Sequence, residues 1–197
     1  MTLDDIFQSN KKKALKSFEE AKLNKNIDEG IIPILDILNK NPNYYTSSSC
    51  YGRIVLLEIP DIGDKKNAIW LGKWHKTISY DDIISSLDIS RKGQLWILAQ
   101  SPIIHIGAKD LDAADRILKI GISCGFKNSG IKSISKNIIV EICSTERLDA
   151  PVGRDGKFFC NKDYLNLLID IANRIFIKSN DKLSKFKTAL LNKNTFL

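Results

Sequence analysis

The segment from Thr46 to Arg53, TSSSCYGR, combines hydroxyls, a thiol, a glycine and a guanidinium directly before the apolar run Ile54–Leu57. Serines beside a glycine offer many hydroxyl and backbone donors in a small space, and arginine adds a rigid fork that suits a carboxylate or a phosphate. Serines and glycines between a helix and a strand also commonly form a plain polar loop. The segment is therefore either such a loop or a binding site for an anionic or zwitterionic ligand.

A second polar segment runs from Gly125 to Ser133 and reads GFKNSGIKS. It takes the equivalent place in a weak internal parallel, because residues 31–59 and 111–142 each pass from an apolar helix through a Ser-Gly segment into a strand ending in Glu-Ile. Two copies of low identity are also compatible with chance. If the parallel holds, two related halves share one sheet, and the segments near residues 50 and 130 face each other around one ligand.

The chain has two histidines, His75 and His105, and neither has a carboxylate at metal-ligand spacing beside it. We therefore expect no metal site. A general base needs a pKa near the working pH and a proton within reach. His105 lies among isoleucines, which favours a hydrogen-bonded core histidine, whereas His75 lies between lysines and is equally compatible with a catalytic or a structural role. The four cysteines form no CxxC pair, so we expect reduced, mostly buried thiols.

Composition narrows the class of protein. No GxGxxG or GxxxxGK[ST] motif is present, which argues against a Rossmann cofactor site. Thirty Lys and Arg against 23 Asp and Glu give a net charge of +7, which favours a polyanionic partner. The lysines at 11, 12, 13 and 16 are typical of a solvated helix face. The first residues lack the apolar run of a secretory signal, and no stretch is apolar enough to span a membrane, so we expect a cytoplasmic protein.

Local signals place the elements that must position these residues. Helices are predicted near residues 2–22, 28–39 and 80–88, from Asp110 to Gly125 with Leu111, Ala114, Leu118 and Ile122 on one face, and from Asn161 onward. Strands are predicted at 53–59, 67–75, 94–99, 103–106, 125–134 and 137–144, with a hairpin tip at Asp155-Gly156. No linker divides the chain. The prediction is an α+β fold with a single domain over residues 1–197, whose mixed, largely antiparallel sheet is flanked by helices.

Four of these segments resemble a known family when taken in order and spacing: TSSSCYGRI, WLGKWH, GFKNSGI and LDAPVGRDGKFFCNKDYLNLLIDIAN. They are similar to the tRNA wybutosine-synthesizing protein 3 family, from about residue 28 to Phe186. Members methylate N4 of a tricyclic wyosine-type guanosine derivative at position 37 of phenylalanine tRNA, with S-adenosylmethionine as methyl donor. The resemblance thus implies a cytoplasmic, RNA-binding methyltransferase in wybutosine biosynthesis that has S-adenosylmethionine as cofactor and the tRNA anticodon loop as partner.

The resemblance also implies roles for individual residues. The cofactor-binding set is Ser48, Ser49, Cys50, Gly52, Arg53, Ser129 and Gly130. The substrate-binding set is Lys73, Trp74, His105, Phe126, Lys127 and Asp149. Methyl transfer requires mainly that donor and nitrogen are aligned and that one proton is accepted. Arg53 is therefore expected to hold the methionine carboxylate of the cofactor, and His75 to take the N4 proton or to orient the base.

Three positions depart from the family pattern. Tyr51 and Trp74 stand where members have small residues, and either ring can stack on a base or pack in the core. Ser101 stands where an acidic residue is common, so the chain lacks a catalytic base if that acid is one. A non-catalytic RNA-binding module with the same cleft is therefore an alternative, and a small-molecule enzyme whose Ser and Arg loops bind phosphate is a third.

Overall fold

The computed structural model describes residues 2–64, 66–90 and 92–192 of the chain. The chain divides into two compact units. Unit 1 takes Met1–Tyr51, Pro102–Thr145 and Asn180–Leu197, and unit 2 takes Gly52–Ser101 and Glu146–Ser179. That these units act as one domain stays a prediction.

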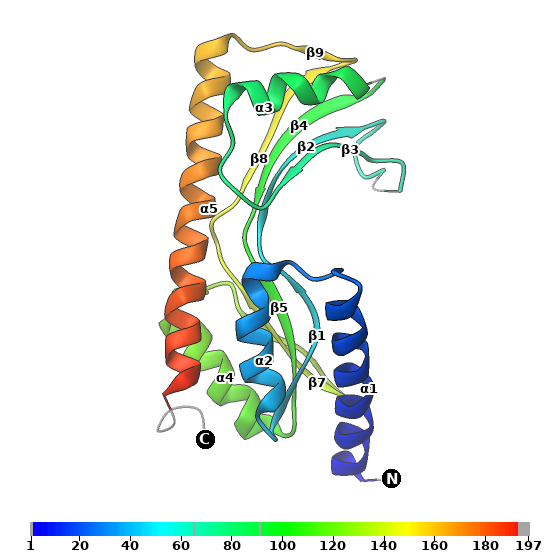
Figure 1. Ribbon diagram of the computed structural model, residues 1–197, viewed down its shortest axis with the longest axis vertical. Coiled ribbons are helices and arrows are strands. Elements are labelled where there is room, and N and C mark those ends of the chain that lie inside the picture. Colours follow the sequence, from blue (N-terminus) through cyan, green and yellow to red (C-terminus); the bar gives the residue numbers. More distant parts are fainter. Residues whose placement is uncertain (1, 65, 91, 193–197) are drawn as a thin grey trace. The chain divides into compact units, whose positions relative to one another are not determined.

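Unit 1 is built on a four-stranded antiparallel sheet of order β1-β5-β7-β6. Figure 1 labels β1, β5 and β7 of this sheet. Its strands are β1 (Tyr44–Cys50), β5 (Ile103–Ala108), β6 (Gly130–Ile134) and β7 (Ile138–Cys143). Its helices are α1 (Leu3–Leu23), α2 (Ile32–Lys40) after a 3-10 turn at Glu29–Ile31, α4 (Leu111–Ser123) and the last part of α5 (Lys162–Leu191). This sheet carries residues from both polar segments.

The two faces of this sheet have different environments because successive strand side chains point to opposite sides. Tyr44, Ile104, Ile106 and Val140 belong to the buried core of unit 1 together with apolar residues of α2 and α4. On the other face, Tyr45 packs against Phe7 of α1 with 5.5 Å between ring centroids. The residues that alternate with the core positions of β5 and β7 therefore lie on the same face as Tyr45.

The predicted helix ends are confirmed by their caps. Thr2 and Asp5 form a reciprocal capping box at α1, and Pro33 lies in the first turn of α2. Asp110 caps α4 by accepting from the Ala113 amide at 2.7 Å. Gly125 follows α4 at φ +98°, where a glycine is favoured.

The predicted apolar face of α4 is partly wrong. Leu111 and Ile122 are exposed, and the buried residues of this helix are Ala113, Ala114, Ile117, Ile120 and Gly121. The close contact between α4 and β7 leaves room only for a small residue at the point of contact. At Gly121, an added Cβ would lie 2.7 Å from the Ile142 side chain.

Unit 2 holds a five-stranded antiparallel sheet of order β3-β2-β4-β8-β9. Its strands are β2 (Arg53–Ile59), β3 (Ile69–Trp74), β4 (Gln94–Gln100), β8 (Leu148–Arg154) and β9 (Lys157–Phe158). Its helices are α3 (Tyr80–Ser85), a 3-10 turn at Ser86–Ile89 and the first part of α5. The Asn173 amide of α5 bonds both the N–H and the C=O of Ile78 at 2.8 Å, which fixes the segment before α3.

The α+β class and the antiparallel pairing are confirmed, but three details of the prediction are wrong. The strands form two sheets instead of one. Residues 46–50 belong to strand β1 and are not a loop. The two copies of the internal parallel share a sheet only in part, because β1 of the first copy lies in the sheet of β6 and β7 whereas β2 lies in the other sheet. Within the described residues, no helix is long and apolar enough to cross a membrane.

Candidate functional site

Arg53 opens β2 in unit 2 and is held on two sides. Its Nε donates to the Gln100 side-chain oxygen at 2.7 Å, and its guanidinium carbon lies 4.5 Å from the centre of the Trp70 ring. The pairing of β2 with β4 places Arg53 directly opposite Gln100. Two Nη groups carry four further N–H donors in a fixed plane. This arrangement suits recognition of a carboxylate or a phosphate.

His75 lies just after β3 and bonds to the chain at Gly52. Its Nδ1 is 2.8 Å from the Gly52 carbonyl oxygen, and Gly52 itself is at φ +92°. A carbonyl only accepts, so Nδ1 carries the hydrogen and the lone pair of the neutral ring is on Nε2. His75 is therefore tied to the motif residue that precedes Arg53.

The other predicted substrate residues of unit 2 differ in whether their side chains are exposed or already contact other parts of the protein. Lys73 is exposed. The Trp74 ring lies on the backbone of Gly72, where a Cβ would come within 2.0 Å of it, so one ring face is covered. Asp149 is engaged by Arg147, whose Nε donates to its carboxylate at 2.6 Å. Trp74 and Asp149 thus have internal partners, and Lys73 reaches solvent.

Tyr51 closes unit 1 and packs in the same way as Trp74. Its ring lies on Gly30, where a Cβ would approach to 2.5 Å, and its amide donates to the Asp28 carboxylate at 2.9 Å. Tyr51 and Trp74 therefore each pack one ring face on a glycine of their own unit.

A row of polar side chains crosses the sheet of unit 1 on the face shared with Tyr45. Ser48 Oγ is 2.7 Å from His105 Nδ1, and His105 Nε2 is 2.8 Å from Glu141 Oε2. The other carboxylate oxygen of Glu141 is 2.8 Å from Lys132 Nζ. The backbone register supports this row, because Ser48 pairs with His105, His105 with Glu141, and Glu141 with Gly130.

Two register shifts, one in each edge strand, orient the side chains of Ser48 and Lys132 at the ends of this row. In β1 the shift falls between Thr46 and Ser48, so that Ser48, and not Ser47, lies opposite His105. In β6 the shift falls between Ile131 and Ser133 and makes Lys132 the extra residue. Bulges of this kind redirect a side chain and are frequent beside active sites.

The prediction that the segments near 50 and 130 face each other around one ligand is wrong. Ser48 lies on β1 and Gly130 on β6, which are the two edge strands of one sheet, with β5 and β7 between them. Three strand spacings separate them by about 14 Å. The polar row described above connects the two segments instead.

Ser129 and Phe126 have structural partners. Ser129 Oγ donates to the Phe126 carbonyl at 2.7 Å and accepts from the Cys143 amide at 3.0 Å. Phe126 is fully buried and packs edge-on against Phe186 with 5.8 Å between centroids. Phe126 is thus a core residue that cannot stack on a base, which corrects its predicted substrate role. Lys127, Ser48 and Ser49 are exposed, and Cys50 is half-buried.

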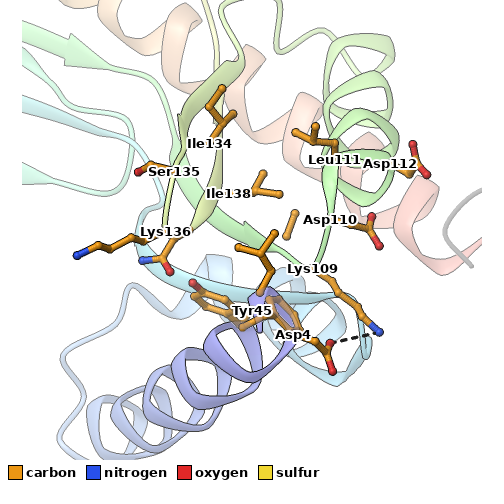
Figure 2. A pocket seen from close by; sticks show the side chains of 14 residues that line it. Asp4, Tyr45, Lys109, Asp110, Leu111, Asp112, Ile134, Ser135, Lys136 and Ile138 are labelled. Atoms are coloured by element: carbon orange, nitrogen blue, oxygen red, sulfur yellow. Dashed lines mark ion pairs between the residues drawn. The ribbon is translucent and has the colours of Figure 1, made fainter. Parts of the chain in front are cut away.

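A cavity of about 580 Å³ lies elsewhere in unit 1 (Figure 2). Apolar side chains such as Phe7, Tyr45 and Ile138 line it, and an ion pair between Asp4 and Lys109 at 3.5 Å lies at its edge. Its volume falls in the range of about 300–1,000 Å³ typical of small-molecule sites. Its lining combines Tyr45, on the face that carries His105, with Ala108, which belongs to the core on the opposite face.

Comparison with known proteins decides the family. The sequence profile described as methyltransferase TYW3 matches residues 9–192. The chain belongs to the methyltransferase TYW3 family. It is 48% identical over 188 residues to a tRNA(Phe) 7-((3-amino-3-carboxypropyl)-4-demethylwyosine(37)-N(4))-methyltransferase 1 from Pyrococcus abyssi, covering 95% of this chain and 97% of the relative. A relative of the same activity from Methanocaldococcus jannaschii is 41% identical over 186 residues, covering 93% and 96%.

Solved structures agree with this TYW3 assignment. A protein from Pyrococcus horikoshii has the same fold with a TM-score of 0.92 and 45% identity, covering 96% of this chain and 98% of that one. A protein from Aeropyrum pernix matches with a TM-score of 0.71 and 28% identity over 83% of this chain and 96% of that one. The recognised resemblance and the expectation of a methyltransferase are thereby confirmed.

Sequence reasoning named Ser48 and His105 but missed their partners in this TYW3 chain. Glu141 and Lys132 complete the polar row, and neither was a candidate. A signal was present, because Glu141 is the one charged residue of the largely apolar strand NIIVEICS. A half-buried charge on a strand requires a partner, and that requirement could have directed attention to the nearest histidine.

The carboxyl of Glu141 makes the stability of unit 1 depend on pH. Burial raises its pKa, but the hydrogen bonds and charges of Lys132 and His105 outweigh burial and lower the pKa overall. A lowered pKa in the folded state contributes stability above the unfolded pKa of about 4.3, and this is lost as pH falls through the folded value.

We expect Glu141→Gln to lower the free energy of unfolding by on the order of 1–3 kcal/mol at neutral pH, the worth of hydrogen bonds to a charged group. The loss should shrink at an acidic pH below the lowered folded pKa, where the wild-type carboxyl is protonated too. Urea unfolding followed by circular dichroism at both pH values measures it. Glu20→Gln, which removes only an exposed ion pair with Lys16, is the control. A loss that is equal at both pH values would contradict this account of Glu141.

Proposed function

We propose that this chain transfers a methyl group from S-adenosylmethionine to N4 of a 4-demethylwyosine derivative at position 37 of phenylalanine tRNA. The observation that carries the proposal is the near full-length identity of 48% to a relative named for this activity. The net charge of +7 is consistent with a tRNA partner, because lysine and arginine displace counterions from phosphates. We place the reaction in the cytoplasm.

The test is a methyl-transfer assay on tRNA(Phe) that carries the 4-demethyl intermediate, followed by nucleoside mass spectrometry. The product nucleoside should be heavier by one CH₂ unit, with the mass located on the tricyclic base. The matched control is tRNA(Phe) with unmodified guanosine at the same position, which should stay unchanged. Methylation of both substrates alike, or of neither, would refute the proposed substrate.

The side chains of unit 2 fit the methyl donor. S-adenosylmethionine supplies a methyl carbon activated by a sulfonium, together with a carboxylate and an ammonium for recognition. The guanidinium of Arg53, oriented by Gln100 and Trp70, is a donor set that suits this carboxylate. A guanidinium that is already immobilised loses little conformational entropy when it binds. Arg53 would therefore hold the carboxylate of the donor.

We expect Arg53→Ala to weaken S-adenosylmethionine binding about 10- to 100-fold, because a charge-assisted hydrogen bond contributes about 1.5–3 kcal/mol. Titration calorimetry of the variant and the wild type measures this. Arg174→Ala is the control, because Arg174 is highly exposed and pairs with Asp170 within α5. Unchanged affinity in Arg53→Ala would remove this residue from the cofactor site.

His75 and Lys73 complete the proposed substrate contacts in unit 2. The bond from His75 Nδ1 to the Gly52 carbonyl fixes the ring plane, which supports a role in orienting the base. The exposed ammonium of Lys73 suits a phosphate of the anticodon loop, and the partly exposed Trp74 suits stacking on an unpaired base. Lys127 in unit 1 is a further phosphate contact of the same kind.

A further inference from the structure

The charge states of the polar row determine its direction. The pKa of Glu141 is lowered, so its carboxylate is ionised at neutral pH and can only accept hydrogen bonds. His105 Nε2, 2.8 Å from Glu141 Oε2, must then carry the hydrogen. In the neutral ring, Nδ1 holds the lone pair and accepts the hydrogen of the Ser48 hydroxyl at 2.7 Å. The hydrogens donated by Ser48 and His105 therefore both point toward Glu141.

This direction turns the Ser48 oxygen into an acceptor that faces solvent. Ser48 is exposed, whereas the His105 side chain is 31% exposed and that of Glu141 is 16% exposed. The hydroxyl hydrogen is engaged by His105, so the oxygen presents its lone pairs outward. A hydroxyl backed by an imidazole and a carboxylate is the arrangement that activates serine in hydrolases.

We propose that Ser48, His105 and Glu141 form the proton acceptor for N4 methylation, a proposal that rests on the function proposed above. As the N4–carbon bond forms and the carbon–sulfur bond breaks with its electrons on sulfur, the N4 proton passes to Ser48 Oγ. The Ser48 hydroxyl proton passes to His105 Nδ1. The imidazolium formed is stabilised by the Glu141 carboxylate, and Lys132 keeps Glu141 ionised and in place.

Glu141 provides a carboxylate that is linked to Ser48 by two contacts, of 2.7 Å and 2.8 Å. The acceptor is therefore assigned to unit 1.

Histidine tautomers test the direction of the row without activity. The chain has two histidines, so a nitrogen-15 histidine-labelled sample at about pH 8, above the ordinary imidazole pKa, gives two ring systems, and His75→Gln assigns them. We expect the Nε2–H tautomer for His105 and the Nδ1–H tautomer for His75. Ser48→Ala should move the Nδ1 resonance of His105 and leave His75 unchanged. An Nδ1–H tautomer for His105 would overturn the proposal.

Single-turnover methyl transfer tests the role of the hydroxyl. Ser48→Ala should slow the reaction about 10- to 100-fold, with S-adenosylmethionine and tRNA affinities unchanged, and Ser48→Thr should recover most of the rate. Ser47→Ala, one residue away in the bulge, is the control and should keep the wild-type rate. A wild-type rate in Ser48→Ala, or a loss explained by weaker cofactor binding, would overturn the proposal. If the wild type transfers no methyl group, the proposed function fails. The nitrogen-15 measurement of the His105 tautomer then still tests the hydrogen-bond direction from Ser48 to Glu141.

Discussion

Glu141→Gln is expected to slow methyl transfer about 10²- to 10⁴-fold at saturating cofactor and tRNA, the usual contribution of a positioned general base. The glutamine keeps the size of the side chain but has no charge to stabilise the His105 imidazolium. Its amide can also donate to His105 Nε2, which favours the opposite tautomer. In serine proteases, the same exchange of acid for amide behind the catalytic histidine causes a large rate loss for this reason. Single-turnover kinetics measures the rate.

The matched control for this variant is Glu146→Gln. Glu146 is also a partly buried carboxylate paired with a lysine, Lys178, at 3.0 Å, but it lies in unit 2. We expect its rate to stay within about threefold of the wild type, since surface ion pairs contribute about 0–1 kcal/mol. Equal losses in the two variants would show that Glu141 acts only through stability and would contradict its catalytic assignment.

Phe126→Ala is expected to lower the free energy of unfolding by about 3–5 kcal/mol, the cost of removing a buried phenyl ring and leaving a cavity. Phe126 has no exposed surface and packs on Phe186 of α5. Denaturant unfolding followed by tryptophan fluorescence or circular dichroism measures the loss. Cofactor affinity should stay unchanged when it is measured without denaturant, at a temperature where the variant is folded.

Phe159→Ala is the control, because Phe159 is 78% exposed and belongs to unit 2. Its unfolding free energy should change by less than about 0.5 kcal/mol. If Phe126→Ala instead left stability intact and weakened tRNA binding, Phe126 would be a stacking residue after all, and the description of unit 1's core would be wrong.

Helix positions in this chain are predictable because their signals are local. Thr2 with Asp5, Pro33, Asp110 and Gly125 act within one turn of the helix that they begin or end, and each is found in that role. The Asp155-Gly156 hairpin is local in the same sense, with both residues at positive φ. Such features depend on neighbours a few residues away, so the sequence reveals them directly.

Sheet membership is not local, and it is where the prediction failed. The strand pairs β1 and β2, and β4 and β5, follow each other with two residues between them, yet each pair is divided between two sheets. The alternation of apolar residues is the same whichever sheet a strand joins. The stretch QLWILAQSPIIHI therefore does not reveal that β4 pairs with β2 and β8 whereas β5 pairs with β1 and β7.

The polar row could not be predicted for a related reason. Ser48 and His105 are 57 residues apart, and His105 and Glu141 are 36 residues apart. Shifting a strand by one residue reverses which face its side chains take, and the bulge in β1 makes such a shift. Without that bulge, Ser47 would lie opposite His105. The register of paired strands, rather than any motif, assembles this site.

The repeated Glu-Ile dipeptide illustrates how one pattern serves two purposes. Glu58 in unit 2 is 1% exposed and bonds the Lys92 amide at 3.0 Å and the Ser90 hydroxyl, which anchors a loop. Glu141 in unit 1 bonds His105 and Lys132 on the partly exposed face of the sheet. The sequence parallel between the two was visible, but only the partners separate a structural carboxylate from a candidate catalytic one.

The central claim is that the proton released in methyl transfer goes to the His105 row of unit 1. The most direct measurement compares single-turnover rates of His105→Gln and His75→Gln with wild type at saturating S-adenosylmethionine and tRNA. The account predicts a loss of about 10²- to 10⁴-fold for His105→Gln and about tenfold or less for His75→Gln, which only orients the base. A large loss in His75→Gln with a near wild-type rate in His105→Gln would contradict it.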